Sequence, residues 1–174
     1  CEEAIYGLQD TIVALKGLFN NAKDLEGVIR KYIDEHDALK KDVEKFQAQA
    51  VERAKDKLVE NAREINGVKV VTAVLPMEPA AAKDLVFKVR EALPENMICV
   101  VGSYFNDKPM LSVMFSDDMV KDHGLNAGKM IREAAKAIQG GGGGQPGFAQ
   151  AGGRNEEGIS LAMEKMEALI AAEA

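Results

Sequence analysis

The most distinctive stretch of this sequence is Gly140–Gly153, which reads GGGGGQPGFAQAGG. A flexible linker between domains has a similar composition, and this alternative stays open. Three features favour an ordered segment. Only about twenty residues of helical pattern follow the stretch, it contains Phe148, Gln150 and alternating alanines, and fixing glycines costs more backbone entropy than fixing other residues. We therefore expect a loop whose bare backbone N–H groups approach an anion, such as a sugar-phosphate chain.

The glycine run does not match the common nucleotide-binding motifs. No Gly-Lys-Ser or Gly-Lys-Thr follows it, so it is not a P-loop. It also follows a helical pattern rather than a strand, which excludes the dinucleotide-binding fingerprint. A site for one bound nucleotide of either kind is therefore not expected.

Positive charge is concentrated on both sides of the glycines. Lys129, Arg132 and Lys136 are spaced three and four residues apart, so they share one face of the expected helix Asn126–Gln139. Arg154 follows the stretch directly. The formal net charge of the chain is −6, so phosphate contacts would depend on such a local patch. An ordinary solvated helix face is the alternative, because acidic residues lie nearby in the sequence.

The first part of the chain is predicted to be a helical arm. Apolar residues recur at spacings of three and four, which is typical of a helix that packs on a partner. The register slips between Ala22 and Leu25, next to Asn20 and Asn21, and Asp24 is available as a helix N-cap. We predict a helical hairpin, with one continuous helix as the alternative. The second arm would run for about 40 residues against about 20 for the first, so its apolar stripe stays partly uncovered and favours self-association.

Beyond this arm the hydrophobic period changes and predicts a small globular unit. The fold class is α+β, with a sheet of three or four strands, helices packed on one face and the glycine-rich loop. The predicted domains are a helical coiled-coil arm at 1–66, ended by Asn66-Gly67, and a globular domain at 67–174. The expected elements of the globular domain are the strand Val68–Leu75, the helix Ala80–Leu93, the strands Ile98–Tyr104 and Met110–Phe115, and the helices Asn126–Gln139 and Glu156–Ala171.

Residues suited to catalysis or metal binding are scarce. Cys99 lies in an apolar run and is expected to be a small buried hydrophobe, which favours a reducing cytoplasm. His36 occupies a core position of the helical pattern and His123 lies in a turn, so they form no metal-binding pair. No acid–base pair stands out. We therefore expect no catalytic residue, no metal site and no cofactor in this chain.

The ends of the chain and its hydropathy bear on its context. No apolar run approaches the roughly 20 residues that a bilayer span requires, so no membrane association is expected. The sequence starts at Cys1, inside a helical pattern and without an initiator Met. We expect it to be a piece of a longer protein.

Together with this order of helices and strands, the stretch Gly140–Gly153 resembles the C-terminal domain of bacterial-type alanyl-tRNA synthetases. The resemblance extends over essentially all 174 residues, and the glycine-rich stretch is its specific part. It implies a non-catalytic module of an alanine–tRNA ligase that binds the outer corner of tRNA-Ala, bridges the aminoacylation and editing domains, and forms a homodimer through the helical arm in the cytoplasm. ATP, Mg and Zn are implied only for the parts of the parent enzyme outside this chain.

The resemblance also implies a set of RNA-binding residues. The basic residues of this set rest on adjacency to the glycines, whereas the others match the family stretch by position. The set is Gly140, Gly141, Gly142, Gly143, Gly144, Gln145, Pro146, Gln150, Gly152, Gly153, Lys129, Arg132, Lys136 and Arg154.

Two other interpretations stay open. The same globular unit is associated with DHH-family phosphoesterases and RecJ-type exonucleases, so the chain could be the single-strand-binding domain of such an enzyme. The long arm and the absence of an Asp-His-His cluster disfavour this alternative. The other is a purely structural dimerisation module.

Overall fold

A computed structural model of the chain describes the backbone of residues 2–173 and the side chains of residues 5–172. It consists of two compact units, Cys1–Phe46 and Gln47–Ala174, and the boundary falls inside one long helix. The first unit contains α1 (Glu2–Leu18) and the first part of α2 (Leu25–Glu60). No helix in the described part of the chain is long and apolar enough to cross a membrane.

The predicted break in the helical arm is confirmed. Asn20 and Asn21 have φ of 53° and 56°, in the left-handed region that ends α1. Asp24 then accepts a hydrogen bond of 3.0 Å from the backbone N–H of Gly27 in the first turn of α2, which is the capping role expected of it. The continuous helix is therefore excluded.

The two helices of the arm do not pack along each other within the described residues, in contrast to the predicted hairpin. A ring contact joins Phe19 and Tyr32, with 5.5 Å between the centroids. His36 is not enclosed in a helical seam, because its side chain is 77% exposed. The apolar stripes therefore face solvent in a single chain, and the exposed members are Ile5, Leu8, Ile12, Leu15, Tyr32, Ile33, Leu39, Val43 and Phe46.

The second unit is built on a six-stranded mixed sheet in the order β1-β2-β3-β4-β6-β5. β2 and β3 run parallel and the other neighbouring pairs are antiparallel, so a helix provides the crossover between β2 and β3. The elements are β1 (Arg63–Ile65), β2 (Val68–Leu75), α3 (Pro79–Ala92), β3 (Met97–Phe105), β4 (Lys108–Phe115), α4 (Asp117–Lys121), α5 (Ala127–Ala135), β5 (Gly141–Gln145), β6 (Phe148–Gly152), a 3-10 turn (Glu156–Gly158) and α6 (Ile159–Glu173).

The α+β class is confirmed, although the sheet has six strands where three or four were predicted. One extra strand is β1, which was predicted to be the end of the helical arm. Asn66 and Gly67, with φ of 52° and 84°, form the tight turn of the β1–β2 hairpin instead of a helix end. The other two, β5 and β6, are the glycine-rich stretch itself, which lacks the alternating apolar pattern of a strand.

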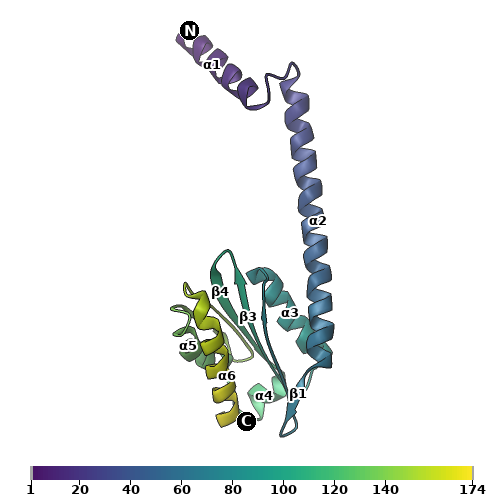
Figure 1. Ribbon diagram of the computed structural model, residues 1–174, viewed down its shortest axis with the longest axis vertical. Coiled ribbons are helices and arrows are strands. Elements are labelled where there is room, and N and C mark those ends of the chain that lie inside the picture. The colour runs from purple at the N-terminus through teal and green to yellow at the C-terminus, as the bar shows by residue number, and fades with distance from the viewer. Residues whose placement is uncertain (1, 174) are drawn as a thin grey trace. The chain divides into compact units, whose positions relative to one another are not determined.

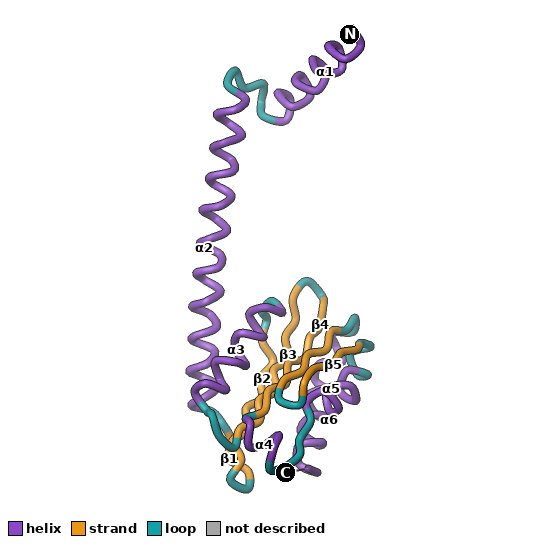
Figure 2. Tube along the Cα trace, turned by 180° about the vertical axis from the view of Figure 1, so that it is seen from behind, coloured by secondary structure: helices purple, strands orange, loops and turns teal. Residues whose placement is uncertain are grey.

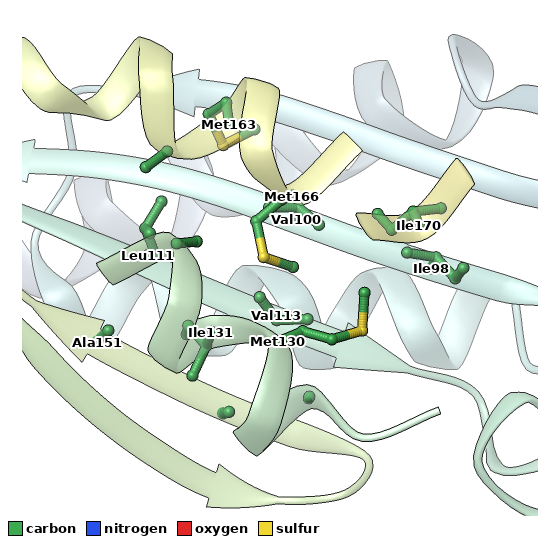
Figure 3. Packing of buried hydrophobic residues seen from close by; sticks show 14 of the residues in the cluster. Ile98, Val100, Leu111, Val113, Met130, Ile131, Ala151, Met163, Met166 and Ile170 are labelled. Carbon is green, nitrogen blue, oxygen red and sulfur yellow. The ribbon is translucent and has the colours of Figure 1, made fainter. Parts of the chain in front are cut away.

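Helices cover both faces of the sheet, whereas one covered face was predicted (Figure 1). On one face α5 and α6 pack on a core that includes Val100 and Leu111, and Figure 3 shows Met130 and Met166 over these strands. On the other face α3 packs on residues such as Val101. Because β3 is buried on both sides, its sequence is a continuous apolar run rather than an alternating one.

The last part of α2 belongs to the globular unit. Val51 is 2% exposed, and Ala54, Leu58 and Val59 pack with it into the core on the α3 side. The boundary between compact units therefore lies after Phe46, earlier than the predicted boundary at residue 66, because the sheet already holds the helix beyond that point.

Cys99 is fully buried in β3, as predicted, and burial raises the pKa of its thiol to about 12. Because the thiolate is the reactive form, we expect native Cys99 to resist iodoacetamide at about pH 8 and to react fully in urea. Peptide mass spectrometry reads this out separately from Cys1. Modification of native Cys99 as fast as in the unfolded chain would contradict the burial.

Candidate nucleic-acid interface

The glycine-rich stretch forms a β-hairpin rather than the predicted loop. β5 is the edge strand of the sheet and pairs antiparallel with β6, in a register that places Gly141 opposite Gly152 and Gln145 opposite Phe148. Figure 2 shows β5 at this edge beside α5. A hairpin that is part of the sheet also excludes the flexible linker.

Four of the glycines are required by close packing. A Cβ added at Gly140, Gly142 or Gly144 would come closer than 3.0 Å to backbone atoms of the β6 segment. A Cβ at Gly153 would come equally close to the backbone of Ile138. The missing side chains at these positions are explained by the fold before any ligand is considered.

Three other glycines are open. Nothing lies within 4 Å of a Cβ added at Gly141 or Gly152, and a Cβ at Gly143 would meet only the Arg132 side chain, at 3.6 Å. None of the three has the left-handed φ that favours glycine. The fold therefore does not require glycine at these three positions. Close approach of another molecule to the backbone would explain why glycine is present there. We call Gly141, Gly143 and Gly152 the open glycines.

The helix α5 fixes the hairpin at the edge of the sheet. The Asn126 side chain caps this helix by accepting a hydrogen bond of 3.0 Å from the Lys129 N–H. The Ala127 N–H donates to the Pro146 carbonyl in the hairpin turn at 2.9 Å. Gly128 lets the helix lie directly against β5, because a Cβ there would be 2.9 Å from a carbonyl oxygen of that strand. The hairpin and the basic face of α5 therefore form one continuous surface.

The predicted basic residues differ in their surroundings. Arg132 lies against the open face of the hairpin at Gly143. Lys136 forms an ion pair with Glu133 at 2.7 Å, and this contact lowers the pKa of Glu133. Lys129 and Arg154 are exposed, and neither forms an ion pair with another described side chain. Lys136 is thus partly neutralised, whereas the other three cations are available.

The glutamines and the proline of the stretch also lie in different surroundings. Gln145 and Pro146 are exposed at the tip of the hairpin, where they border a groove of about 290 Å³ that also contains Phe148. Gln150 is half-buried, and its amide donates a hydrogen bond of 2.9 Å to the Ser112 hydroxyl. This bond gives Gln150 a structural role that its position in the sequence did not indicate.

A second groove, of about 480 Å³, lies at the other end of the hairpin. Lys108 lies in this groove and was not among the predicted site residues, because only the pairing of β4 with β6 brings the start of β4 to the glycines. The residues that line the groove are Pro79, Lys108, Pro109, Met110, Gln139, Gly140, Gly141, Gly152, Gly153 and Arg154.

Metal ligands do not gather at this surface. Among the described residues, no group of three or more His, Cys, Asp and Glu side chains is placed to hold a metal ion. What the surface offers is bare edge-strand backbone, several cations and two grooves.

The part of the chain that contains this surface matches a known protein family. Residues 67–172, more than half of the chain, match the model of the DHHA1 domain. The chain belongs to the DHHA1 domain family. The DHHA1 match starts at the β1–β2 turn and ends in α6, so it contains the hairpin, α5 and both grooves.

Relatives of this DHHA1 chain are alanine–tRNA ligases. That of Bacteroides fragilis strain YCH46 is 50% identical over 165 residues, which are 95% of this chain and 19% of the ligase. That of Porphyromonas gingivalis is 36% identical over 166 residues, again 95% of this chain and 19% of the ligase. The chain therefore spans about a fifth of the length of these relatives.

A solved structure shares the fold. The C-Ala domain of Aquifex aeolicus alanyl-tRNA synthetase has a TM-score of 0.51 and 24% identity, over 61% of this chain and 97% of that domain. The resemblance to alanyl-tRNA synthetases predicted from the glycine-rich stretch is confirmed by these relatives and this fold.

The two kinds of glycine predict different effects of substitution. We expect Gly142→Val to lower the free energy of unfolding by about 1–3 kcal/mol or more, because the side chain overlaps the β6 backbone. We expect Gly141→Val to change it by less than about 0.5 kcal/mol, because its site is open. Urea unfolding followed by circular dichroism compares the two variants. Equal losses of stability would show that the open and packed positions are not distinct.

Proposed function

We propose that this chain is the non-catalytic, tRNA-binding module of an alanyl-tRNA synthetase, and that the parent protein is an ATP-dependent alanine–tRNA ligase. The names of the relatives over 95% of the chain support the parent, and the C-Ala fold supports the place within it. The observation that carries tRNA binding is the bare backbone of the open glycines beside the available guanidinium of Arg132.

The edge of β5 provides the contact surface of this proposal. An edge strand has N–H and C=O groups that no neighbouring strand pairs. At Gly141 nothing lies over this backbone, and at Gly143 the only side chain beside it is the Arg132 guanidinium, which can itself contact a phosphate. Lys129, Arg132 and Arg154 provide the positive charge that the chain as a whole, at −6, does not.

Such contacts recognise shape rather than sequence. Phosphate and sugar contacts fix the position of a nucleic acid but carry no base information. We therefore propose that the module holds the outer corner of tRNA, where the D and T loops meet, and keeps one tRNA available to both the aminoacylation and the editing domains. Alanine identity is then read elsewhere in the parent enzyme, whose parts outside this chain would also hold ATP, Mg and Zn.

The chain itself supplies positioning rather than chemistry in this proposal. Cys99, the cysteine among the described residues, lies in the core with a raised pKa and cannot act there as a nucleophile. The carboxylates of Glu52 and Asp117 are engaged in ion pairs with Lys88 and Arg90. A cytoplasmic location follows from the proposed parent.

We also propose that the helical arm joins two copies of the chain. Leu39, Val43 and Phe46 are exposed by 65%, 53% and 69% and recur at spacings of four and three along α2. A second copy offers an identical stripe, so two chains can bury both stripes in a symmetric interface. His36 lies three residues before Leu39, on the same stripe, where it would set the register of the pair.

Binding to tRNA is testable by fluorescence anisotropy with a tRNA-Ala transcript. We expect weak binding with two to four phosphate contacts, each adding about 0.7–0.9 to the slope of log affinity against log salt. Gly141→Val combined with Gly143→Val should abolish binding while the circular dichroism spectrum stays unchanged, because the new side chains cover the backbone.

The controls are an unrelated hairpin RNA and a single-stranded oligonucleotide. Preference for tRNA supports the proposal, whereas preference for the single strand favours a phosphoesterase-type module. Failure to bind either structured RNA, at any salt concentration, would refute an RNA role.

Sedimentation equilibrium tests the dimer. We expect a concentration-dependent dimer that Leu39→Glu combined with Val43→Glu converts to a monomer, because charges are costly in an apolar helical interface. The double variant should keep the circular dichroism signal of the globular unit. A wild-type chain that stays monomeric at high concentration would contradict the proposed role of the arm.

A further inference from the structure

The groove at Lys108 is lined on one side by the glycine-rich stretch and on the other by the start of β4, which lies far from that stretch in the sequence. We infer that the tip of the β3–β4 hairpin is a second wall of the nucleic-acid site. Lys108 binds a backbone phosphate together with Arg154, and Phe105 stacks on an exposed base. The inference rests on the proposed tRNA binding and extends it to two residues and to base contact.

Hydrogen bonds bring the two cations to the same place. The Gly153 N–H donates to the Pro109 carbonyl at 3.0 Å, and these residues are the direct neighbours of Arg154 and Lys108. The Arg154 N–H donates to the Ile138 carbonyl at 2.9 Å, which fixes this segment to the turn that follows α5. Both cations line the groove of about 480 Å³.

No described carboxylate forms an ion pair with the cations of this groove. Lys108 and Arg154 are exposed and form no ion pair with any other described side chain, whereas Lys88 pairs with Glu52 at 2.5 Å. A phosphodiester would supply the missing negative charge. Gly141 and Gly152, the open pair at this end of the hairpin, line the same groove and leave room for a polymer to pass.

Phe105 adds an aromatic face beside Lys108. The two residues are directly opposite each other in the β3–β4 pairing, so their side chains lie on the same face of the hairpin. Asn106 and Asp107, with φ of 49° and 58°, form the tight turn that fixes this pair. Phe105 is 42% exposed and takes part in no ring pair among the described residues. By contrast, the ring centroids of Phe87 and Phe148 are 5.0 Å apart.

The combination of an unpaired aromatic ring with uncompensated cations favours a nucleic acid over other partners. Proteins that hold unpaired bases stack them on aromatic rings while a positively charged groove follows the backbone. A small anion would leave the exposed ring of Phe105 without a stacking partner. An acidic protein surface would not require the bare backbone of the open glycines. The loops at the corner of a tRNA present both phosphates and exposed base faces.

Base stacking is testable with one tryptophan, because the chain contains no Trp. In Phe105→Trp we expect the tRNA-Ala transcript to quench the indole emission. Leu161→Trp is the matched control, since Leu161 is 49% exposed on α6 and does not line the groove. Heparin, an anionic polymer without bases, should leave Phe105→Trp unquenched. Unchanged Phe105→Trp emission with bound tRNA, or equal quenching by heparin, would overturn base stacking.

Phosphate binding by Lys108 is testable by the salt dependence of tRNA affinity. We expect Lys108→Ala to weaken binding several-fold at low salt and to lower the log–log slope by about 0.7–0.9, the share of one phosphate. Lys69→Ala removes an exposed strand lysine that does not line the groove and should behave as wild type. Wild-type affinity and slope in Lys108→Ala would refute this contact. Failure of the unsubstituted chain to bind tRNA would refute the proposed function itself.

Discussion

The backbone of β5 approaches β6 and α5 so closely that side chains are excluded at alternate positions of the strand. This contact makes a run of glycines into the edge of a six-stranded sheet. It also determines where α5 lies, because the helix is capped by Asn126 and joined to the hairpin turn through Ala127 and Pro146. The basic face of α5, the two grooves and the bare strand edge all take their positions from it.

The same contact divides the glycines of the hairpin into those that packing requires and those that it does not. Gly142 and Gly144 are required by packing, whereas Gly141, Gly143 and Gly152 are not. Glycine in a strand costs roughly 0.5–1 kcal/mol relative to alanine, so each open glycine weakens the sheet without improving its packing. A binding role for the backbone at the open glycines explains why glycine stands there despite this loss of stability. Composition could not divide the stretch in this way, because every glycine looks alike in sequence.

Local signals in the sequence predicted much of the fold. The apolar runs predicted β2, β3 and β4, an amphipathic pattern predicted α3, and the last helix was expected close to where α6 lies. The capping role of Asp24 is confirmed. The misses have physical causes. Asn66-Gly67 is equally compatible with a helix end and a hairpin turn, glycine strands carry no periodic pattern, and the apolar run of β3 was not recognised as a strand covered on both faces.

The candidate site was predictable only where it is local in the sequence. The glycines and the basic residues of α5 are adjacent along the chain, and the structure does bring Arg132 to Gly143. Lys108 and Phe105 join them only through the pairing of β4 with β6, which no local pattern indicates.

Hydroxyl-radical footprinting of a tRNA-Ala transcript with this chain tests the central claim most directly. We expect protection of the outer corner, where the D and T loops meet; protection confined to the acceptor or anticodon stem, or none, would contradict it.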